Sequence, residues 1–179
     1  NKIVKEEYLR IVAGIAGALG KFFFTRGYFS YGIEFARAGI KSNIELNNID
    51  TASTQYMYLG QIQIRQYDFE AFAETVKEMQ ELAKRTGDIN AKIDSLWAKG
   101  RLDSAAGNFT TAIKSFEEAG ELMKTKIAKE NSREFLDELD NETLKAYAKS
   151  NSIGNLALVI SEIAKAYVHT NFLTTGQKL

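Results

Sequence analysis

The chain contains few of the residues that enzymes use for nucleophilic or metal chemistry. Its only histidine is His169, and it has no cysteine. A Ser-His-Asp triad would have to use His169, and no Gly-x-Ser-x-Gly segment is present to expose a nucleophilic serine. Without cysteine, the chain has no disulfide, thiolate nucleophile or cysteine metal site. We therefore expect a non-catalytic protein with no cofactor and no metal.

Two segments resemble ligand-binding motifs but lack what those motifs require. Residues 134–142 carry five acidic side chains without the spacing of a calcium loop, so a solvated helix face explains them more simply. Residues 14–21, GIAGALGK, resemble a phosphate-binding loop. Five residues separate its outer glycines instead of four, and Phe22 stands where a magnesium-binding hydroxyl is needed. We expect no nucleotide site.

The composition favours a soluble, helical protein. Lys and Arg together number 23, as do Asp and Glu, so the chain is neutral and has no overall field to attract nucleic acid or an anionic membrane. Proline is absent, and Ala, Leu, Glu and Lys recur throughout. This composition predicts an all-α fold with turns made by Gly, Asn and Asp. The absence of cysteine favours, without fixing, a cytoplasmic location.

The N-terminal segment, residues 3–20, resembles a membrane-spanning or signal segment. Its uncharged run from Ile11 to Gly20 is bounded by Arg10 and Lys21 and is only ten residues long, too short to cross a bilayer. No small-residue cleavage site follows it. We expect a buried helix here. Because the chain starts at Asn1 instead of Met, we interpret it as a fragment or a processed product.

A helical hairpin is predicted for residues 96–122. Gly107-Asn108 is a turn signal. Small and apolar residues recur at three- and four-residue spacing on both sides of it, which predicts one apolar stripe on each helix. Gly100, Ala112 and Ala119 would allow close approach of the two backbones, with Phe109 and Phe116 filling the space beside them.

The hairpin pattern occurs three times, 40 residues apart. Its turns are Gly27-Tyr28-Phe29, Tyr67-Asp68-Phe69 and Gly107-Asn108-Phe109. A repeat of this length predicts helix pairs that stack and share a core. We place the pairs at about 3–26 and 28–43, 49–66 and 68–86, and 89–106 and 109–130, so that the three units cover about 3–43, 49–86 and 89–130 within residues 1–130. Residues 131–179 are expected to form a displaced or capping helical segment of the same domain, including a helix from Ile153 to Val168.

These units resemble tetratricopeptide repeats. The resemblance rests on Gly100, on Ala112 twelve residues later, and on Phe116 and Ala119. The period of 40 exceeds the usual 34, Gln63, Lys99 and Asp103 occupy usually apolar positions, and the terminal proline is missing. Units of this length are similar to those of bacterial peptide-sensing regulators and of proteasome-lid or COP9-type subunits. The resemblance implies an α-α superhelix, a tetratricopeptide-like solenoid.

The resemblance also implies a concave groove, lined by the first helix of each pair, that binds a protein or peptide. Carried over by position, the groove residues are Lys21, Phe24, Tyr58, Gln61, Arg65, Trp97, Arg101, Ser104 and, in the displaced unit, Tyr167. Aromatic and Arg side chains there would stack on a peptide and pair with its carboxylates. Packing between helices is an equally good explanation of Phe24, Tyr58 and Trp97.

Three functions remain open from the sequence. The favoured one is a scaffold or adaptor module that binds a protein or peptide and no nucleic acid or membrane. The second is a peptide-sensing domain of a larger regulator, or the helical part of a proteasome-lid or COP9-type subunit. The third is an enzyme, which would need clustered titratable groups in the groove. Self-association is a related possibility, because an open solenoid end exposes an apolar face that another copy can cover.

Overall fold

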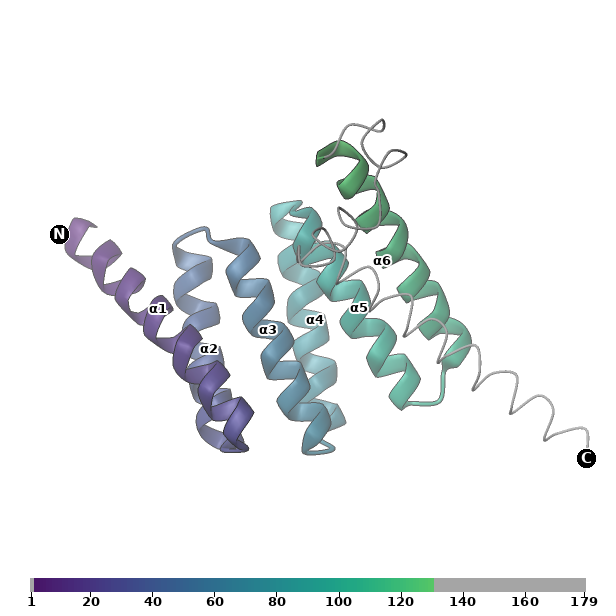
Figure 1. Cartoon of the computed structure of the whole chain (residues 1–179), viewed down its shortest axis with the longest axis horizontal. Helices are drawn as coiled ribbons and strands as arrows, with labels where there is room; N and C mark the ends of the chain where they lie inside the picture. The colour runs from purple at the N-terminus through teal and green to yellow at the C-terminus, as the bar shows by residue number, and fades with distance from the viewer. Residues whose placement is uncertain (1, 131–179) are drawn as a thin grey trace, which may run out of the picture. The chain divides into compact units, whose positions relative to one another are not determined.

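The computed structural model describes residues 2–130, which form six α-helices (Figure 1). The helices are α1 (Lys2–Arg26), α2 (Phe29–Glu45), α3 (Ile49–Arg65), α4 (Phe69–Thr86), α5 (Ile89–Ala105) and α6 (Phe109–Glu130). This part of the chain contains no strand, which confirms the all-α class. Each helix begins and ends within two residues of its predicted position. The predicted helix at 153–168 and the capping role of 131–179 lie outside the described residues.

Left-handed backbone recurs at every turn of the chain from α1 to α6. Positive φ angles occur at Gly27, Asn47, Tyr67, Gly87 and Gly107, spaced 20 residues apart. At four of these turns the amide after the left-handed residue donates to a carbonyl five residues earlier, as from Tyr28 to Phe23 over 2.9 Å. This bond caps the C-terminus of the preceding helix. A left-handed residue therefore follows every helix from α1 to α5.

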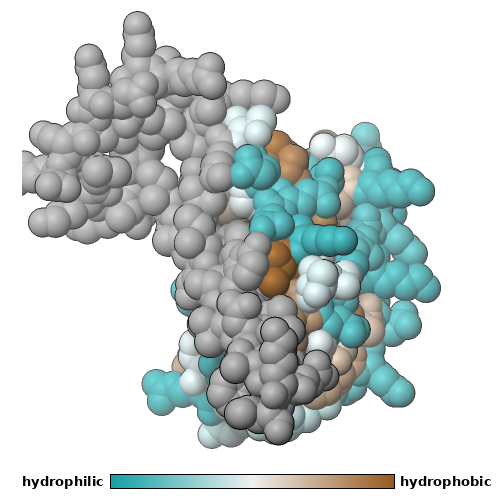
Figure 2. Space-filling view, turned by 90° about the vertical axis from the view of Figure 1, so that its right-hand side faces the viewer, coloured by the Kyte–Doolittle hydropathy of each residue, from teal (hydrophilic) through white to brown (hydrophobic). Residues whose placement is uncertain are grey.

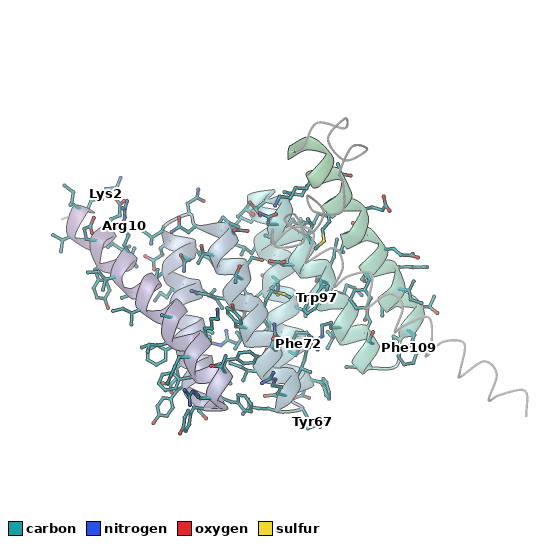
Figure 3. All side chains as sticks on the ribbon, in the orientation of Figure 1. Lys2, Arg10, Tyr67, Phe72, Trp97 and Phe109 are labelled. Atoms are coloured by element: carbon teal, nitrogen blue, oxygen red, sulfur yellow. The ribbon has the colours of Figure 1, made fainter. Side chains whose placement is uncertain are left out.

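Glycines sit where the two helices of a hairpin come closest. A Cβ built at Gly60 of α3 would lie 2.7 Å from the ring of Phe72 in α4, which Figure 3 places between these helices. A Cβ at Gly100 of α5 would lie 2.5 Å from the ring of Phe116 in α6. Both rings are buried. Large residues on the second helix thus occupy space that the absent side chains leave on the first.

Equivalent helices of neighbouring hairpins also contact each other. The Phe24 and Tyr58 rings join α1 to α3, with centroids 6.0 Å apart. Arg37 of α2 pairs with Glu78 of α4 at 3.4 Å. The Ser53 hydroxyl of α3 donates to Asp94 of α5 over 2.7 Å. The last two contacts join residues 41 positions apart, close to the repeat length. These contacts are compatible with a helical repeat.

The chain divides into two compact units, residues 1–98 and 99–179, and the boundary falls within α5. The first unit contains α1 to α4 and the start of α5. In the second unit, the exposed positions of α6 are polar wherever its side chains are described, among them Lys114, Glu117, Glu118 and Glu121.

Figure 2 shows one face of the molecule, on which hydrophilic residues predominate among those drawn in colour.

The expectation that the N-terminal helix is buried is correct for only one of its sides. Ala13, Ala16, Gly20 and Phe24 of α1 are buried. Ile3, Val4, Ile11 and Ile15 are exposed, because no described helix packs against the opposite side. Within the described residues, α1 is the one helix long and apolar enough to cross a membrane, although core helices of soluble proteins and signal sequences have the same length and composition.

Candidate partner-binding face

Three of the predicted groove residues meet on one face of the first unit. Phe24 lies in the last turn of α1, and Tyr58 and Arg65 lie on α3. The Phe24 and Tyr58 rings are 6.0 Å apart and tilted by 41°. The Arg65 guanidinium carbon is 4.5 Å from the centre of the Phe24 ring. We call these three residues the Phe24 cluster.

Helix geometry explains why α3 presents these residues together. Tyr58, Gln61 and Arg65 are spaced by three and four residues, so they lie on one side of the helix. The side of α3 next to these residues is buried, with Leu59 and Ile62 fully inaccessible to solvent. Tyr58 and Gln61 are half-buried and Arg65 is exposed. The face therefore changes from apolar at Phe24 to charged at Arg65.

The Phe24 ring holds the Arg65 guanidinium over its face. A cation at this distance from an aromatic centre is attracted by the ring, with an energy of about 0.5–1 kcal/mol at an exposed site. Among the described residues, no carboxylate lies within ion-pair distance of Arg65. Its N–H groups are thus available to an acceptor from outside the chain. A guanidinium recognises a carboxylate best through two parallel hydrogen bonds.

The other predicted groove residues are placed differently. Lys21 is exposed on α1. Trp97 of α5 is only 6% exposed, so it packs in the interior of the first unit and offers a partner little surface. Arg101 and Ser104 are half-buried and belong to the second unit. Tyr167 lies outside the described residues.

Two further features were not found from the sequence. Arg26, in the last turn of α1, lies over the Phe22 ring at 5.6 Å, so a second guanidinium–aromatic pair forms on that helix. Its only sequence signal is the four-residue spacing of the two side chains. A shallow polar depression of about 780 Å³ also lies where the α2–α3 and α4–α5 turns meet. Its lining includes Asn48, Asp50, Arg85 and Asp88.

The depression is built mainly from helix ends, and its polar groups are largely used within the fold. Asp50 accepts a hydrogen bond from the Asn90 amide at 3.0 Å. Asp88 caps α5 by accepting from the Ala91 amide nitrogen at 2.8 Å. Within residues 2–130, no three acidic or histidine side chains come together as a metal site would require. Comparison of the chain with models of known protein families and with curated proteins gave no match.

Proposed function

We propose that this protein is a non-catalytic module that binds a peptide or protein segment on the face containing the Phe24 cluster. The hairpins then stack as a tetratricopeptide-like solenoid, in which α1 and α3 belong to the layer that lines the groove. Contacts between equivalent helices of neighbouring hairpins support this stacking. The bound segment carries an acidic side chain for Arg65 and an apolar one for the surface between Tyr58 and Phe24.

One observation carries this proposal. Arg65 is stacked on Phe24 and exposed, and it forms no ion pair among the described residues. The stacking limits the rotamers of a side chain that would otherwise lose much freedom on binding. Aromatic and Arg side chains are also those most enriched among residues that dominate binding energy. The half-buried Tyr58 beside them gives the face an amphipathic ring.

A selection from a random peptide library tests the proposal, because the library presents acidic and apolar residues in every order. The 179-residue chain is used as bait, and the affinities of selected peptides are measured by titration calorimetry. We expect the selected peptides to share an Asp or Glu next to an apolar residue. Arg65→Gln should weaken their binding about tenfold, and Tyr58→Ala by a similar factor, since each removes one recognition element.

Arg85→Gln is the matched control, because it removes the same charge at the polar depression instead of at the Phe24 cluster. It should leave the affinity unchanged. If Arg85→Gln weakens binding and Arg65→Gln does not, the depression is the binding site and the proposed face is wrong. A library that yields no binder after selection contradicts the peptide-binding function itself.

A further inference from the structure

The exposed side of α1 carries a row of apolar residues that the proposed function does not use. The row consists of Val4, Tyr8, Ile11, Ile15, Ala18 and Phe22. Val4 and Tyr8 are each 64% exposed, Ile11 is 59%, Ile15 is 54% and Phe22 is 49%. These large side chains lie in a continuous line on one helix, which differs from the scattered apolar residues of ordinary surfaces. We call this line the α1 row.

The spacing of the α1 row is that of a coiled-coil seam. The steps along it alternate between four and three residues, with Val4, Ile11 and Ala18 seven apart and Tyr8, Ile15 and Phe22 seven apart. A heptad pattern of this kind places every member against a partner helix. It covers nearly the whole length of α1, so the partner is expected to be a helix aligned along it.

The repeat itself indicates that a helix belongs on this side of α1. Ile15 and Phe22 correspond to Gln55 and Ile62 of α3, 40 residues later, which are buried. Atoms of those two α3 side chains lie within 3 Å of where Cβ atoms of Gly39 and Gly32 in α2 would stand. This side of α3 therefore faces the preceding hairpin. The same side of α1 has no described helix against it.

A second copy of α1 can cover the α1 row over its full length, and it supplies charges that match those beside the row. The helix has 25 residues, whereas α2, α3 and α5 have 17 each. At 1.5 Å per residue, α1 is about 37 Å long and a helix such as α2 about 25 Å. The row from Val4 to Phe22 spans about 27 Å, so a helix of the shorter length reaches nearly all of it, and one of 22 residues, such as α6, reaches all of it. Another α1 covers the row completely.

The charges beside the row fix the direction of the pairing. In an antiparallel pair, Val4 faces Phe22, Tyr8 faces Ala18 and Ile11 faces Ile15 of the other copy. Glu7 of each copy then faces Lys21 of the other copy on the same flank of the seam. The two-fold axis makes this pair occur twice per dimer. Both are exposed and form no ion pair among the described residues. A parallel pair would instead bring Lys21 near Arg26, a repulsive contact.

We propose that the protein forms a symmetric dimer through an antiparallel coiled coil of two α1 helices, with Glu7 of each copy paired to Lys21 of the other. The interface is isologous, as closed dimers require. It leaves the exposed Arg65 of the Phe24 cluster out of the helix–helix seam. Dimerisation through α1 and peptide binding at Arg65 can therefore be tested independently.

Sedimentation equilibrium of the 179-residue chain over a roughly hundredfold concentration range is the first test. We expect a monomer–dimer equilibrium. Ile11→Asp and Ile15→Asp should each raise the dimer dissociation constant at least about tenfold, because each places charge in the seam. Tyr67→Asp is the matched control, since Tyr67 is 81% exposed at the α3–α4 turn, and it should leave the equilibrium unchanged. Circular dichroism verifies that each variant is folded.

Charge reversal tests the antiparallel geometry. Glu7→Lys and Lys21→Glu should each weaken the dimer severalfold, and the double reversal should restore it, because the two pairs are then formed with opposite signs. A general loss of solubility or helicity would not be rescued in this way. If the double reversal is no better than the single ones, the proposed arrangement is wrong.

A lipid surface could also cover the α1 row, and a vesicle-binding experiment with the same protein distinguishes this occupant from a second copy. The chain is mixed with vesicles of phosphatidylcholine and phosphatidylglycerol and centrifuged. We expect the protein to stay in the supernatant. A chain that is monomeric at every concentration and binds the vesicles through Ile11 and Ile15 would overturn the dimer and make α1 an interfacial helix. A protein that is monomeric and does not bind the vesicles also overturns the proposal.

Discussion

The ring of Phe116 occupies the place that a side chain at Gly100 would need. Three ring atoms would lie 2.5, 2.7 and 2.8 Å from a Cβ built on Gly100, and Phe116 itself is fully buried. The ring cannot move aside without displacing other core residues. This contact is the closest of those between an aromatic side chain and a hairpin glycine in the described part of the chain.

Gly100→Ala should therefore destabilise the protein by about 1–2 kcal/mol. The crowding costs about 1–3 kcal/mol, and the better helix propensity of Ala offsets up to about 1 kcal/mol of it. Gly14→Ala is the matched control, because nothing lies within 4 Å of its Cβ position. That change should stabilise by up to about 1 kcal/mol. Urea unfolding followed by circular dichroism measures both, and equal effects at the two glycines would contradict the close contact.

The sequence predicted the helices well because their signals are local. Residues 27, 67 and 107 mark turns in the sequence, and they adopt positive φ angles in the structure. The α1 helix shows the limit of such signals. Its apolar residues predicted burial, yet Ile11 and Ile15 are exposed, because burial depends on which helix packs against them. A periodic pattern identifies an apolar face but not its partner.

The candidate site was predictable only in part, for a similar reason. Tyr58 and Arg65 belong to one helix, so their shared face follows from the seven-residue spacing. The contact of Arg65 with Phe24 joins α3 to α1 and depends on how the hairpins stack. Trp97 matched a groove position but is buried, since the sequence does not show how far a large ring turns inward.

Tyr67→Gly should stabilise the α3–α4 turn. Tyr67 has a φ of 59°, in the left-handed region that Gly27 and Gly107 occupy in the equivalent turns. This conformation costs a non-glycine residue roughly 1–2 kcal/mol. Glycine removes that strain but adds entropy to the unfolded chain, so we expect a net gain of about 0.5–1 kcal/mol in the free energy of unfolding.

Tyr67→Ala is the control for this change. It removes the exposed ring and its edge contact with Phe69 at 6.4 Å, but it keeps the Cβ that makes the left-handed backbone costly. Thermal unfolding should therefore show a higher midpoint for Tyr67→Gly than for Tyr67→Ala. Equal midpoints would mean that this turn is not strained.

The stability of the protein should fall between about pH 10 and pH 12 because of Tyr56. Burial, followed by the nearby Glu78 carboxylate and a hydrogen bond to it, raises the pKa of Tyr56 from 10.0 to about 12. Below pH 10 the hydroxyl is protonated in both the folded and unfolded states, and its full contribution is present. As the pH rises, the unfolded state loses the proton first, so stability is lost until the folded pKa is passed.

The difference between the folded and unfolded pKa of Tyr56 corresponds to a loss of about 2–3 kcal/mol at most from this group. Urea unfolding at several pH values measures it, and Tyr56→Phe is the control because it keeps the ring without the ionisable hydroxyl. The free energy of unfolding of Tyr56→Phe should decline less steeply above pH 10 than that of the natural chain. The ultraviolet absorbance of tyrosinate gives a second measurement, since Tyr56 should be among the last of the eight tyrosines to ionise. Identical pH profiles for the two proteins would contradict the raised pKa.

Exchanging cap residues between repeats tests whether the equivalent turns are energetically alike. Asp68 caps α4, since its carboxylate accepts a hydrogen bond from the Ala71 amide at 3.0 Å. Tyr28 precedes α2 with nearly the same backbone angles but makes no such bond. Asp68→Ala should cost about 1 kcal/mol, and Tyr28→Asp should gain about 0.5–1 kcal/mol after losing the ring contact with Phe23. Urea unfolding of both variants measures these effects, and Tyr28→Asn, a cap without charge, separates hydrogen bonding from the helix dipole. A destabilising Tyr28→Asp would show that the Phe23 contact matters more to this turn than a cap does.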